Sequence, residues 1–472
     1  MKFFIGGQWH DRSDTREVLN PYQGQAIDTV PEATADDIEL ALASSVEGAK
    51  AMSALLGYER YQILHKTADL MRSRAEEMAR TLSAEEGKTL REATGEVMRS
   101  CETLDLAGEE AKRIGGELLP LDGGSGTHGK LGFTLRVPCG VVLAISPFNY
   151  PLNLVCHKVG PALAAGNSVI LKPAADTPLV SLKLVEMLLE AGLPPQGINC
   201  ITGDGKELGR VLCADSRVRK ISFTGSKQVG EEITKIAGLK RVTMELGSNC
   251  PVVVLPDADL GQVAKAIASS GYVNSGQVCL SAQRVIVADD VHDDLIDALR
   301  PVVEAIVPGD QLQEKTTMGP MIRQRDAERV EQWIDEAVSD GARIVTGGER
   351  DKSLMQPTVL SEVTSNMRVY RDELFGPAVA LMRTSNVEEA IAMANDTAYG
   401  LSASIFTRDI DSAVHFARRV DSGMVHINWG TLWRTDSMPF GGLKDSGLGK
   451  EGPKYAIEEM TEIKTVVIHT QS

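Results

Sequence analysis

Apolar residues near the start of the chain recur with a helical period. Between about Ala35 and Ser83 they return every three or four positions, for example at Ile63, Leu64, Ala68, Leu70, Met71 and Met78. This spacing gathers the apolar side chains on one face of a helix, which can then pack against a core. The segment is therefore predicted to be helical.

From Val137 onward the pattern changes to short apolar runs, each followed by glycine or proline and then by a helical stretch. Short runs that are apolar throughout are typical of strands buried on both faces. Their alternation with helices predicts an α/β fold with a doubly wound, Rossmann-like parallel sheet, which binds ligands at the carboxyl ends of its strands. The runs are 141–145, 168–171, 198–201, 220–223 and 242–244.

The pattern then restarts, which predicts a second α/β domain after a boundary near Leu246. Its strand candidates are 252–255, 284–287 and 378–381. Two pieces lie outside the alternation: a hairpin over 118–137 and a strand over 465–468 with no obvious partner in its own domain. An uncovered strand promotes aggregation, so these pieces together indicate a subunit contact.

Composition excludes several classes of protein. The chain has 472 residues, 43% of them hydrophobic, with a formal net charge of −16 and no basic block, so a nucleic-acid partner is not expected. No run approaches the roughly 20 apolar residues of a membrane span, and a cytoplasmic protein is expected. Seven scattered cysteines without a CxxC pair predict neither disulfides nor a metal site.

Two residues suggest carbonyl chemistry. Cys279 follows Gly276 in the run Asn274-Ser275-Gly276-Gln277-Val278-Cys279, where a turn would let backbone N–H groups lower the thiol pKa. Glu245 ends a predicted strand, where partial burial would raise its pKa and let it take a proton from water. A thiol that attacks a carbonyl and a carboxylate that activates water can together oxidise an aldehyde through a thioester.

Three further positions extend this hypothesis. Asn149 lies between two prolines after a strand, and its side-chain amide can stabilise an oxyanion. Gly225 and Gly230 flank a helix start at Ser226 that can hold a pyrophosphate, although the spacing is not the usual GxGxxG. Lys172 ends the strand 168–171 and can reach a ribose. Each feature alone is also compatible with a purely structural role.

Longer motifs carry a family resemblance. Leu171-Lys172-Pro173-Ala174, Glu373-Leu374-Phe375-Gly376-Pro377 and the run 438–447 (MPFGGLKDSG) occur in order. With them the chain resembles the aldehyde dehydrogenase superfamily over essentially its whole length. The resemblance implies a cofactor-binding domain (1–117 and 138–246), a catalytic domain (247–453) and a small β oligomerisation arm (118–137 and 454–472), assembled as a homodimer or homotetramer.

The resemblance also assigns roles residue by residue. It implies Cys279 as nucleophile, Glu245 as base, Asn149 with the Cys279 N–H as oxyanion donors, and Glu451 as a second acid in proton transfer. It implies NAD or NADP as cofactor. Relatives that prefer NAD often carry a glutamate where this chain has Ala175, so NADP is expected to be accepted or even preferred. The implied cofactor-binding residues are Ile145, Ser146, Pro147, Phe148, Lys172, Ala174, Ala175, Gly205, Phe223, Gly225, Ser226, Val229, Leu246, Gly247, Glu373 and Phe375.

Pocket positions predict the kind of aldehyde. His157 replaces an aromatic residue of relatives that use apolar aldehydes. Arg99 matches an arginine that binds the anionic end of the substrate in relatives acting on phosphorylated or carboxylated aldehydes, and Arg434 lies in the loop that shapes the pocket mouth. These residues favour a small polar or anionic aldehyde, such as lactaldehyde or succinate semialdehyde, unless the arginines make only structural salt bridges. A phosphorylated, phosphonate or sulfonate aldehyde is the alternative, and Val278 in place of an arginine argues against the phosphate. The other expected substrate contacts are Tyr150, Val278 and Leu280.

Two other functions would involve the same fold or the same cysteine. A CoA-acylating dehydrogenase would use the same cysteine but generally lacks the glutamate at the Glu245 position. A non-catalytic structural protein would have no reason to keep nucleophile, base and oxyanion donor together.

Overall fold

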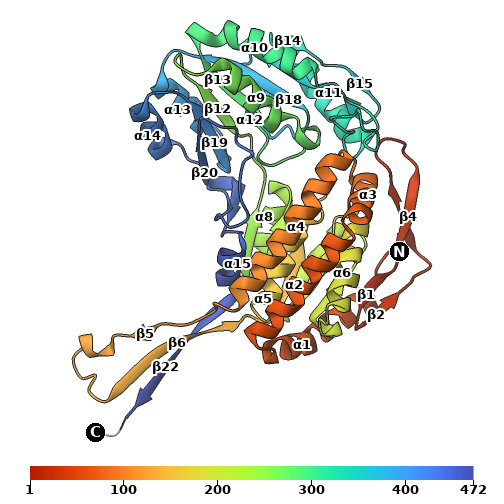
Figure 1. Ribbon diagram of the computed structural model, residues 1–472, viewed down its shortest axis with the longest axis vertical. Coiled ribbons are helices and arrows are strands. Elements are labelled where there is room, and N and C mark those ends of the chain that lie inside the picture. The colour runs from red at the N-terminus through yellow and green to blue at the C-terminus, as the bar shows by residue number, and fades with distance from the viewer. Residues whose placement is uncertain (471–472) are drawn as a thin grey trace.

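The computed structural model describes residues 1–470 and consists of two α/β parts and a projecting arm (Figure 1). The first part is built on an eight-stranded sheet with the order β2-β1-β9-β8-β7-β10-β11-β21. Its five central strands are parallel, whereas β1 and β21 pair antiparallel at the two sides. The bounds are β1 Phe3–Ile5, β2 Gln8–His10, β7 Val141–Ile145, β8 Ser168–Lys172, β9 Ile198–Cys200, β10 Val218–Thr224, β11 Arg241–Glu245 and β21 Gly447–Leu448.

The doubly wound sheet predicted from the sequence is confirmed, and each of the five predicted strands is present. Strands β1, β2 and β21 were not predicted, because they are too short to show a pattern. The helices of this part are α1 Ala35–Ala54, α2 Gly57–Ser73, α3 Ala75–Glu86, α4 Leu90–Ala111, α5 Asn153–Ala164, α6 Leu179–Glu190, α7 Gly205–Ala214, α8 Lys227–Ala237 and α15 Pro453–Glu459.

The predicted helical region is divided into three helices, and the next helix starts close behind. Helix α3 ends at Gly87, which takes a left-handed φ of 97°. Helix α4 begins at Thr89, whose side chain accepts from Glu92 N while the Glu92 carboxylate accepts from Thr89 N. This reciprocal cap stabilises the first turn of α4. Between these two cap residues only Lys88 remains, buried with 1% of its side chain exposed.

The second part is built on a seven-stranded sheet with the order β14-β17-β18-β13-β12-β19-β20, and the predicted strands at β12, β13 and β18 are confirmed. Its strands are β12 Pro251–Val254, β13 Arg284–Ala288, β14 Arg343–Thr346, β17 Thr358–Ser361, β18 Ala378–Thr384, β19 Ser402–Phe406 and β20 Met424–Ile427. Its helices are α9 Leu260–Gly271, α10 His292–Glu304, α11 Gln324–Ser339, α12 Arg368–Arg371, α13 Val387–Asn395 and α14 Ile410–Arg419. Two small hairpins complete the chain: β3 Thr15–Leu19 with β4 Ala26–Pro31, and β15 Arg350–Asp351 with β16 Leu354–Met355.

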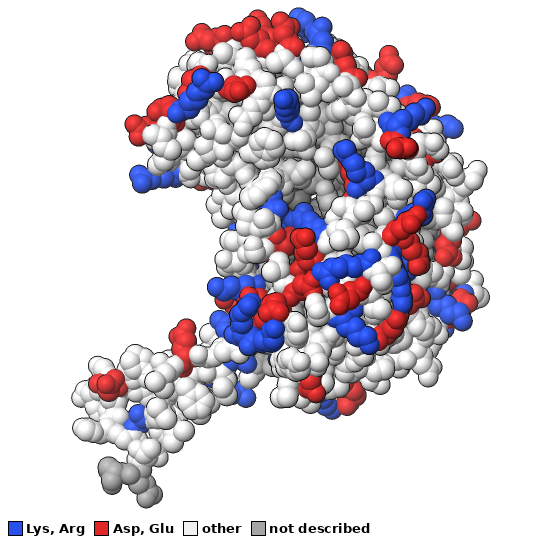
Figure 2. Space-filling view, viewed as in Figure 1, with Lys and Arg blue, Asp and Glu red and all other residues white. Residues whose placement is uncertain are grey.

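The arm is a three-stranded sheet with the order β22-β6-β5. Strand β22 (Thr461–His469) pairs antiparallel along β6 (Lys130–Pro138), and β5 (Leu118–Leu119) pairs with the other side of β6. The terminal strand that lacked a partner in the sequence thus pairs with the predicted hairpin. The arm extends away from the two α/β parts and shows few charges on the face in Figure 2. Its exposed apolar residues are Leu118, Leu131, Leu135, Ile463, Val467 and Ile468.

Candidate active site

The first element of the site is the turn that carries Cys279. After α9, a 3₁₀ turn (η3, Val273–Gly276) has left-handed φ values of 51° at Asn274, 54° at Ser275 and 68° at Gly276. A Cβ on Gly276 would lie 2.1 Å from the Gly376 carbonyl oxygen, so no larger residue fits there. The turn brings Cys279 to partial exposure, whereas the other six cysteines are buried.

Cys279 differs from expectation in its ionisation. The sequence predicted a lowered thiol pKa, but burial raises the pKa of Cys279, and the neighbouring Glu373 raises it further against a smaller lowering by Arg434. The backbone N–H groups of the turn do not compensate for the removal of water. In this state the thiol keeps its proton at neutral pH, so it must lose that proton before it attacks.

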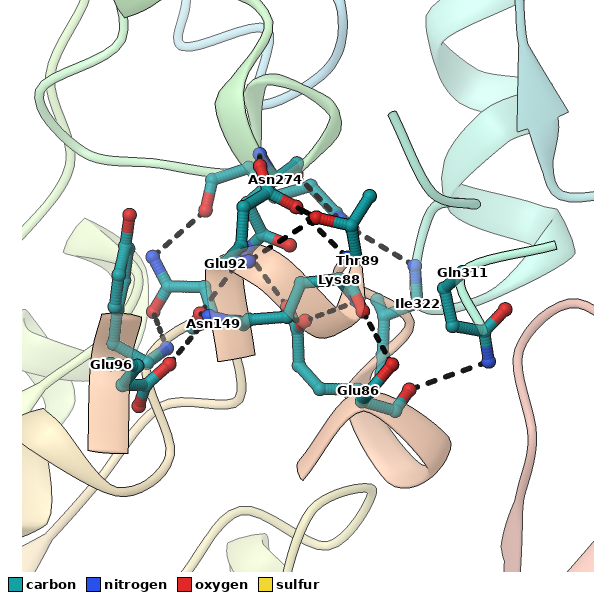
Figure 3. Close-up of polar contacts among 12 residues, drawn as sticks. Glu86, Lys88, Thr89, Glu92, Glu96, Asn149, Asn274, Gln311 and Ile322 are labelled. Atoms are coloured by element: carbon teal, nitrogen blue, oxygen red, sulfur yellow. Dashed lines mark hydrogen bonds and ion pairs between the residues drawn. The ribbon is translucent and has the colours of Figure 1, made fainter. Parts of the chain in front are cut away.

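Asn149 lies beside the cysteine turn. It follows β7, is 4% exposed, and its Nδ2 donates to the Gln277 carbonyl at 2.8 Å. Its own carbonyl accepts from Lys88 Nζ at 2.7 Å and from Asn274 Nδ2 at 3.1 Å (Figure 3). The amide of Asn149 has a second N–H, which leaves one donor for a ligand near Cys279.

Glu245 ends β11 and is 2% exposed. Neither carboxylate oxygen has a hydrogen-bond partner among residues 1–470. Burial raises the pKa of Glu245 well above the ordinary value, and the nearby charge of Glu451 raises it further. The direction agrees with the sequence-based expectation. A Cβ on Gly441 would lie 2.7 Å from Glu245 Oε1, so this carboxylate packs directly against the glycine-rich 438–447 segment.

Glu451 is the second buried carboxylate, and its state is the opposite. Its Oε1 accepts from Lys158 Nζ at 2.5 Å, and Lys158 also donates to Thr224 Oγ1 at 2.7 Å. Burial acts to raise the pKa of Glu451, but the positive charge of Lys158 outweighs it and the pKa is lowered. One carboxylate therefore holds a proton while its neighbour is ionised, which is the arrangement that separates acid from base.

A second cluster of charged side chains centres on Asp436. Arg99 Nε lies 3.0 Å from both Asp436 oxygens, and His157 Nε2 lies 3.0 Å from Oδ1. Arg434 Nη2 is 3.7 Å from the same oxygen. The pKa of Asp436 is lowered, because its hydrogen bonds with His157 and Arg99 outweigh its burial.

Arg434 is the member of this cluster with unused hydrogen-bonding capacity. Its side chain is 5% exposed, and its Nη1 has no hydrogen-bond partner within the described chain. Its guanidinium stacks on the Phe440 ring, 4.1 Å from the centroid. A buried guanidinium N–H without an acceptor is rare and expensive, so it is an expected docking point for an anion.

The remaining predicted substrate residues form an apolar wall. Val278 and Leu280 are buried in a cluster with Leu401, Met424 and Phe440, and Tyr150 and Cys279 pack against it. The Lys88 ammonium lies 4.0 Å from the Tyr150 ring centroid. Cys279 thus packs against apolar side chains, and Arg434 of the Asp436 cluster is close enough to lower the pKa of its thiol.

Most of the predicted cofactor residues lie on loops and helix starts at the carboxyl ends of the first sheet, whereas Glu373 and Phe375 lie in the second part. Ser226 caps α8, with Val229 N donating to its Oγ at 3.4 Å. A Cβ on Gly230 would lie 2.5 Å from a Leu246 methyl carbon, so α8 packs close to that residue. Ile145, Ser146, Pro147 and Phe148 follow each other from the end of β7, Ala174 and Ala175 follow β8, and Phe223 and Gly225 lie at the end of β10.

Two buried polar side chains in this region have few or no hydrogen-bond partners within the described chain. Lys172 is 5% exposed, and burial lowers the pKa of its side chain to about 8. Within residues 1–470 its ammonium donates one hydrogen bond, to the Pro173 carbonyl. Ser146 Oγ has no partner in the same range. A Cβ on Gly205 would lie 3.4 Å from Lys172 Nζ, so the start of α7 faces that lysine. A dinucleotide with ribose hydroxyls and phosphates fits this set of donors.

The two predicted cofactor residues of the second part are Glu373 and Phe375. Glu373 accepts from Ser248 N at 2.8 Å, and burial raises its pKa to about 7. A Cβ on Gly247 would lie 2.4 Å from Glu373 Oε2, so this carboxylate packs directly against Gly247. Phe375 has a left-handed φ of 50°, and its ring meets that of Phe148 edge to face.

A model described as the aldehyde dehydrogenase family matches residues 9–466. The chain belongs to the aldehyde dehydrogenase family. It is therefore an oxidoreductase that oxidises aldehydes with NAD or NADP.

Individual aldehyde dehydrogenases are similar to this chain in sequence and in fold over nearly its whole length. The 3-sulfolactaldehyde dehydrogenase of Priestia megaterium is 47% identical over 99% of this chain and 97% of its own length. The solved structure of aldehyde dehydrogenase 21 from Physcomitrella patens, in complex with the product succinate, gives a TM-score of 0.96 at 37% identity, covering 99% and 98% of the two chains. Glyceraldehyde-3-phosphate dehydrogenase from Methanocaldococcus jannaschii, complexed with NADP, gives 0.94 at 38% identity, covering 98% and 100%. The aldehyde dehydrogenase fold is thereby established.

Two residues of this dehydrogenase site were missed in the sequence. Lys158 follows His157 on α5, a helix buried along its whole length, and adjacent basic residues in an apolar helix are a usable signal. Asp436 stands in the same loop as Arg434 but was given no role. Within residues 1–470 no group of three or more His, Cys, Asp or Glu is arranged to hold a metal. The same residues contain no helix long and apolar enough to cross a membrane.

Proposed function

We propose that this aldehyde dehydrogenase oxidises a small anionic aldehyde to its carboxylic acid, and that a sulfonate-bearing hydroxyaldehyde of the 3-sulfolactaldehyde type is its best substrate. The observation that carries the proposal is the buried Arg434 Nη1 without a partner in the described chain. Arg434 is close enough to Cys279 to lower the pKa of its thiol, so an anion held there would lie near the nucleophile.

The charge of the pocket supports a monoanion. Two guanidinium groups, Arg99 and Arg434, share the single carboxylate of Asp436. Burial lowers the pKa of His157, so its imidazole is neutral at pH 7. One positive charge is left unbalanced, which matches a sulfonate or carboxylate better than a phosphate with its charge of about −1.5 to −2.

Two relatives support placing the sulfonate first. The relative at 47% identity is named for 3-sulfolactaldehyde, and a solved relative holds the anion succinate as product. This ordering replaces the first expectation from the sequence, which placed a hydroxyaldehyde or semialdehyde above the sulfonate. A semialdehyde remains the second candidate because its carboxylate carries the same single charge.

The residues divide the reaction as follows. After losing its proton, Cys279 Sγ attacks the aldehyde carbon, and the spare Asn149 N–H with the Cys279 N–H stabilises the oxyanion of the resulting thiohemiacetal. Bound NAD(P)⁺ supplies the hydride acceptor. Glu245, once deprotonated, takes a proton from the water that cleaves the thioester, and Glu451 with Lys158 relays that proton. The balance is RCHO + NAD(P)⁺ + H₂O giving RCOO⁻ + NAD(P)H + 2H⁺.

Cofactor preference is proposed to lean toward NADP. Ala175 leaves space at the position where a glutamate would repel a 2′-phosphate, and Lys172 provides a nearby positive charge. Solved relatives are complexed with NADP in one case and NAD⁺ in another.

The arm is proposed to join subunits. Strands β5, β6 and β22 form the projecting sheet, and its exposed apolar residues favour burial against a second copy. A homodimer or homotetramer follows from this proposal.

Initial rates of NAD(P)H formation test the substrate proposal. The panel is 3-sulfolactaldehyde, succinate semialdehyde, glyceraldehyde 3-phosphate, lactaldehyde and hexanal, each with NAD and NADP. We expect the highest kcat/KM with 3-sulfolactaldehyde. A higher value with hexanal or with neutral lactaldehyde would overturn the anionic-substrate proposal without affecting the family assignment.

A further inference from the structure

The turn before Cys279 is strained. Asn274 and Ser275 are neighbouring non-glycine residues, both with left-handed backbone angles (φ 51° and ψ 38°; φ 54° and ψ 36°). A left-handed conformation is unfavourable for an L-residue. Two such residues side by side persist only where the surroundings hold them.

Two carboxylates from the junction of α3 and α4 contact Asn274. Glu92 Oε1 accepts from Asn274 N at 2.9 Å, and Glu86 Oε1 accepts from Asn274 Nδ2 at 2.8 Å. Glu86 ends α3 and Glu92 lies in the first turn of α4, far from the turn in sequence but next to it in Figure 3. Asn274 is thereby tied through both its backbone and its side chain.

The same junction ties the oxyanion residue. Lys88 Nζ donates to the Asn149 carbonyl at 2.7 Å and to Glu96 Oε2 at 2.6 Å. Glu96 Oε1 in turn accepts from Leu152 N at 2.9 Å, just after Asn149. The junction of α3 and α4 therefore contacts both the Cys279 turn and the Asn149 loop (Figure 3).

We propose that Glu86 and Glu92 are positioning residues that hold Asn274 in its left-handed conformation and so set the position of Cys279 relative to Asn149. Glu92 has a second role as cap of α4, because its Oε2 accepts from Thr89 N and Oγ1. The test must separate these two roles. Thr89→Ala weakens the cap but leaves the contact between Glu92 Oε1 and Asn274 N, so it is the matched control.

The experiment compares Glu92→Ala, Thr89→Ala and Glu92→Ala/Asn274→Gly in the full-length protein. Three quantities are measured: Tm, kcat and KM with any accepted aldehyde, and the rate of Cys279 alkylation by iodoacetamide against a Cys279→Ser blank. We expect Glu92→Ala to lower kcat about 10- to 100-fold and to change the alkylation rate, with the KM for NAD(P) within about twofold, because a shift of about 1 Å can have this effect. Thr89→Ala should lower Tm to a similar degree with kcat within about twofold.

The double variant tests whether Glu92 acts through the left-handed conformation of Asn274. Glycine takes a left-handed φ without steric cost, so Asn274→Gly should recover about fivefold or more of the lost kcat in the Glu92→Ala background. Equal Tm losses with unchanged kcat in Glu92→Ala would reduce Glu92 to a helix cap and overturn the proposal. Failure of the glycine rescue would also overturn it. If Glu92→Ala does not fold, Glu92→Asp keeps the charge but shortens the reach, and the same loss of kcat is required.

Discussion

Arg99 meets Asp436 through two equal contacts, with Nε 3.0 Å from each carboxylate oxygen. This geometry commits the Arg99 guanidinium to Asp436, whereas Arg434, 3.7 Å from the same carboxylate, keeps a free buried N–H in the described chain. The two arginines therefore have different expected roles. Arg434 is proposed to bind the anionic end of the substrate, and Arg99 to orient the Asp436 cluster.

Arg434→Met is expected to lower kcat/KM for 3-sulfolactaldehyde about 10- to 100-fold, since a hydrogen bond to a charged group contributes about 1.5–3 kcal/mol. The value for neutral lactaldehyde should change by less than about threefold. Arg99→Met is the matched control and should have a smaller effect on the sulfonate. Equal losses for the two aldehydes in Arg434→Met would contradict an anion-binding role.

Glu245→Gln should separate the two halves of the reaction. The variant keeps the shape of the side chain but cannot take a proton from water, so the steady rate should fall about 10²- to 10⁴-fold. A stopped-flow burst of reduced cofactor should persist, because thioester formation precedes hydrolysis. Cys279→Ala is the control and should show no burst. Loss of burst and steady rate together in Glu245→Gln would place Glu245 in the first half instead.

Glu451→Gln should shift the pH profile of kcat. With Glu245 as the proposed base, kcat should rise with pH as the raised pKa of Glu245 is passed. Burial and the charge of Glu451 both raise that pKa, and removing the charge lowers it. The rising limb should therefore move to lower pH in the variant. A limb that stays in place or moves to higher pH would show that another group controls it.

Ala175→Glu should change cofactor selectivity. A carboxylate there can accept from the 2′-hydroxyl of NAD and repels the 2′-phosphate of NADP. We expect the ratio of kcat/KM for NADP to that for NAD to fall about tenfold or more, while Ala175→Gln, without the charge, changes it less. Selectivity that is the same in both variants would mean that the 2′-phosphate does not lie beside Ala175.

Ile463→Arg tests the arm. Ile463 lies on β22 and is 64% exposed, so a charge there should weaken subunit association without disturbing the core. Sedimentation velocity should show a smaller assembly. Leu239→Arg, at a fully exposed position after α8, should leave the assembly unchanged. An unaltered sedimentation coefficient for Ile463→Arg would argue against the arm as the subunit contact.

The sequence predicts most of the sheet framework because its central strands are short, apolar and evenly spaced, as at Val141–Ile145 and Pro251–Val254. It predicts the candidate chemistry where motifs are local, as around Cys279. It does not predict contacts that join distant segments. Lys158 meets Glu451 across 293 positions, and His157 meets Asp436 across 279. The raised pKa of Cys279 was missed for a related reason, because burial depends on the whole fold rather than on the turn.

The pairing of β6 with β22 sets an order of events during synthesis. Arg136 on β6 and Thr461 on β22, which hydrogen-bond to each other, are separated by 325 positions. On the ribosome, β6 therefore waits with an open edge until β22 has emerged, and closing so long a loop is slow. The arm is thus expected to fold late. Until β22 has paired with β6, the open edge of β6 exposes newly made chains to aggregation.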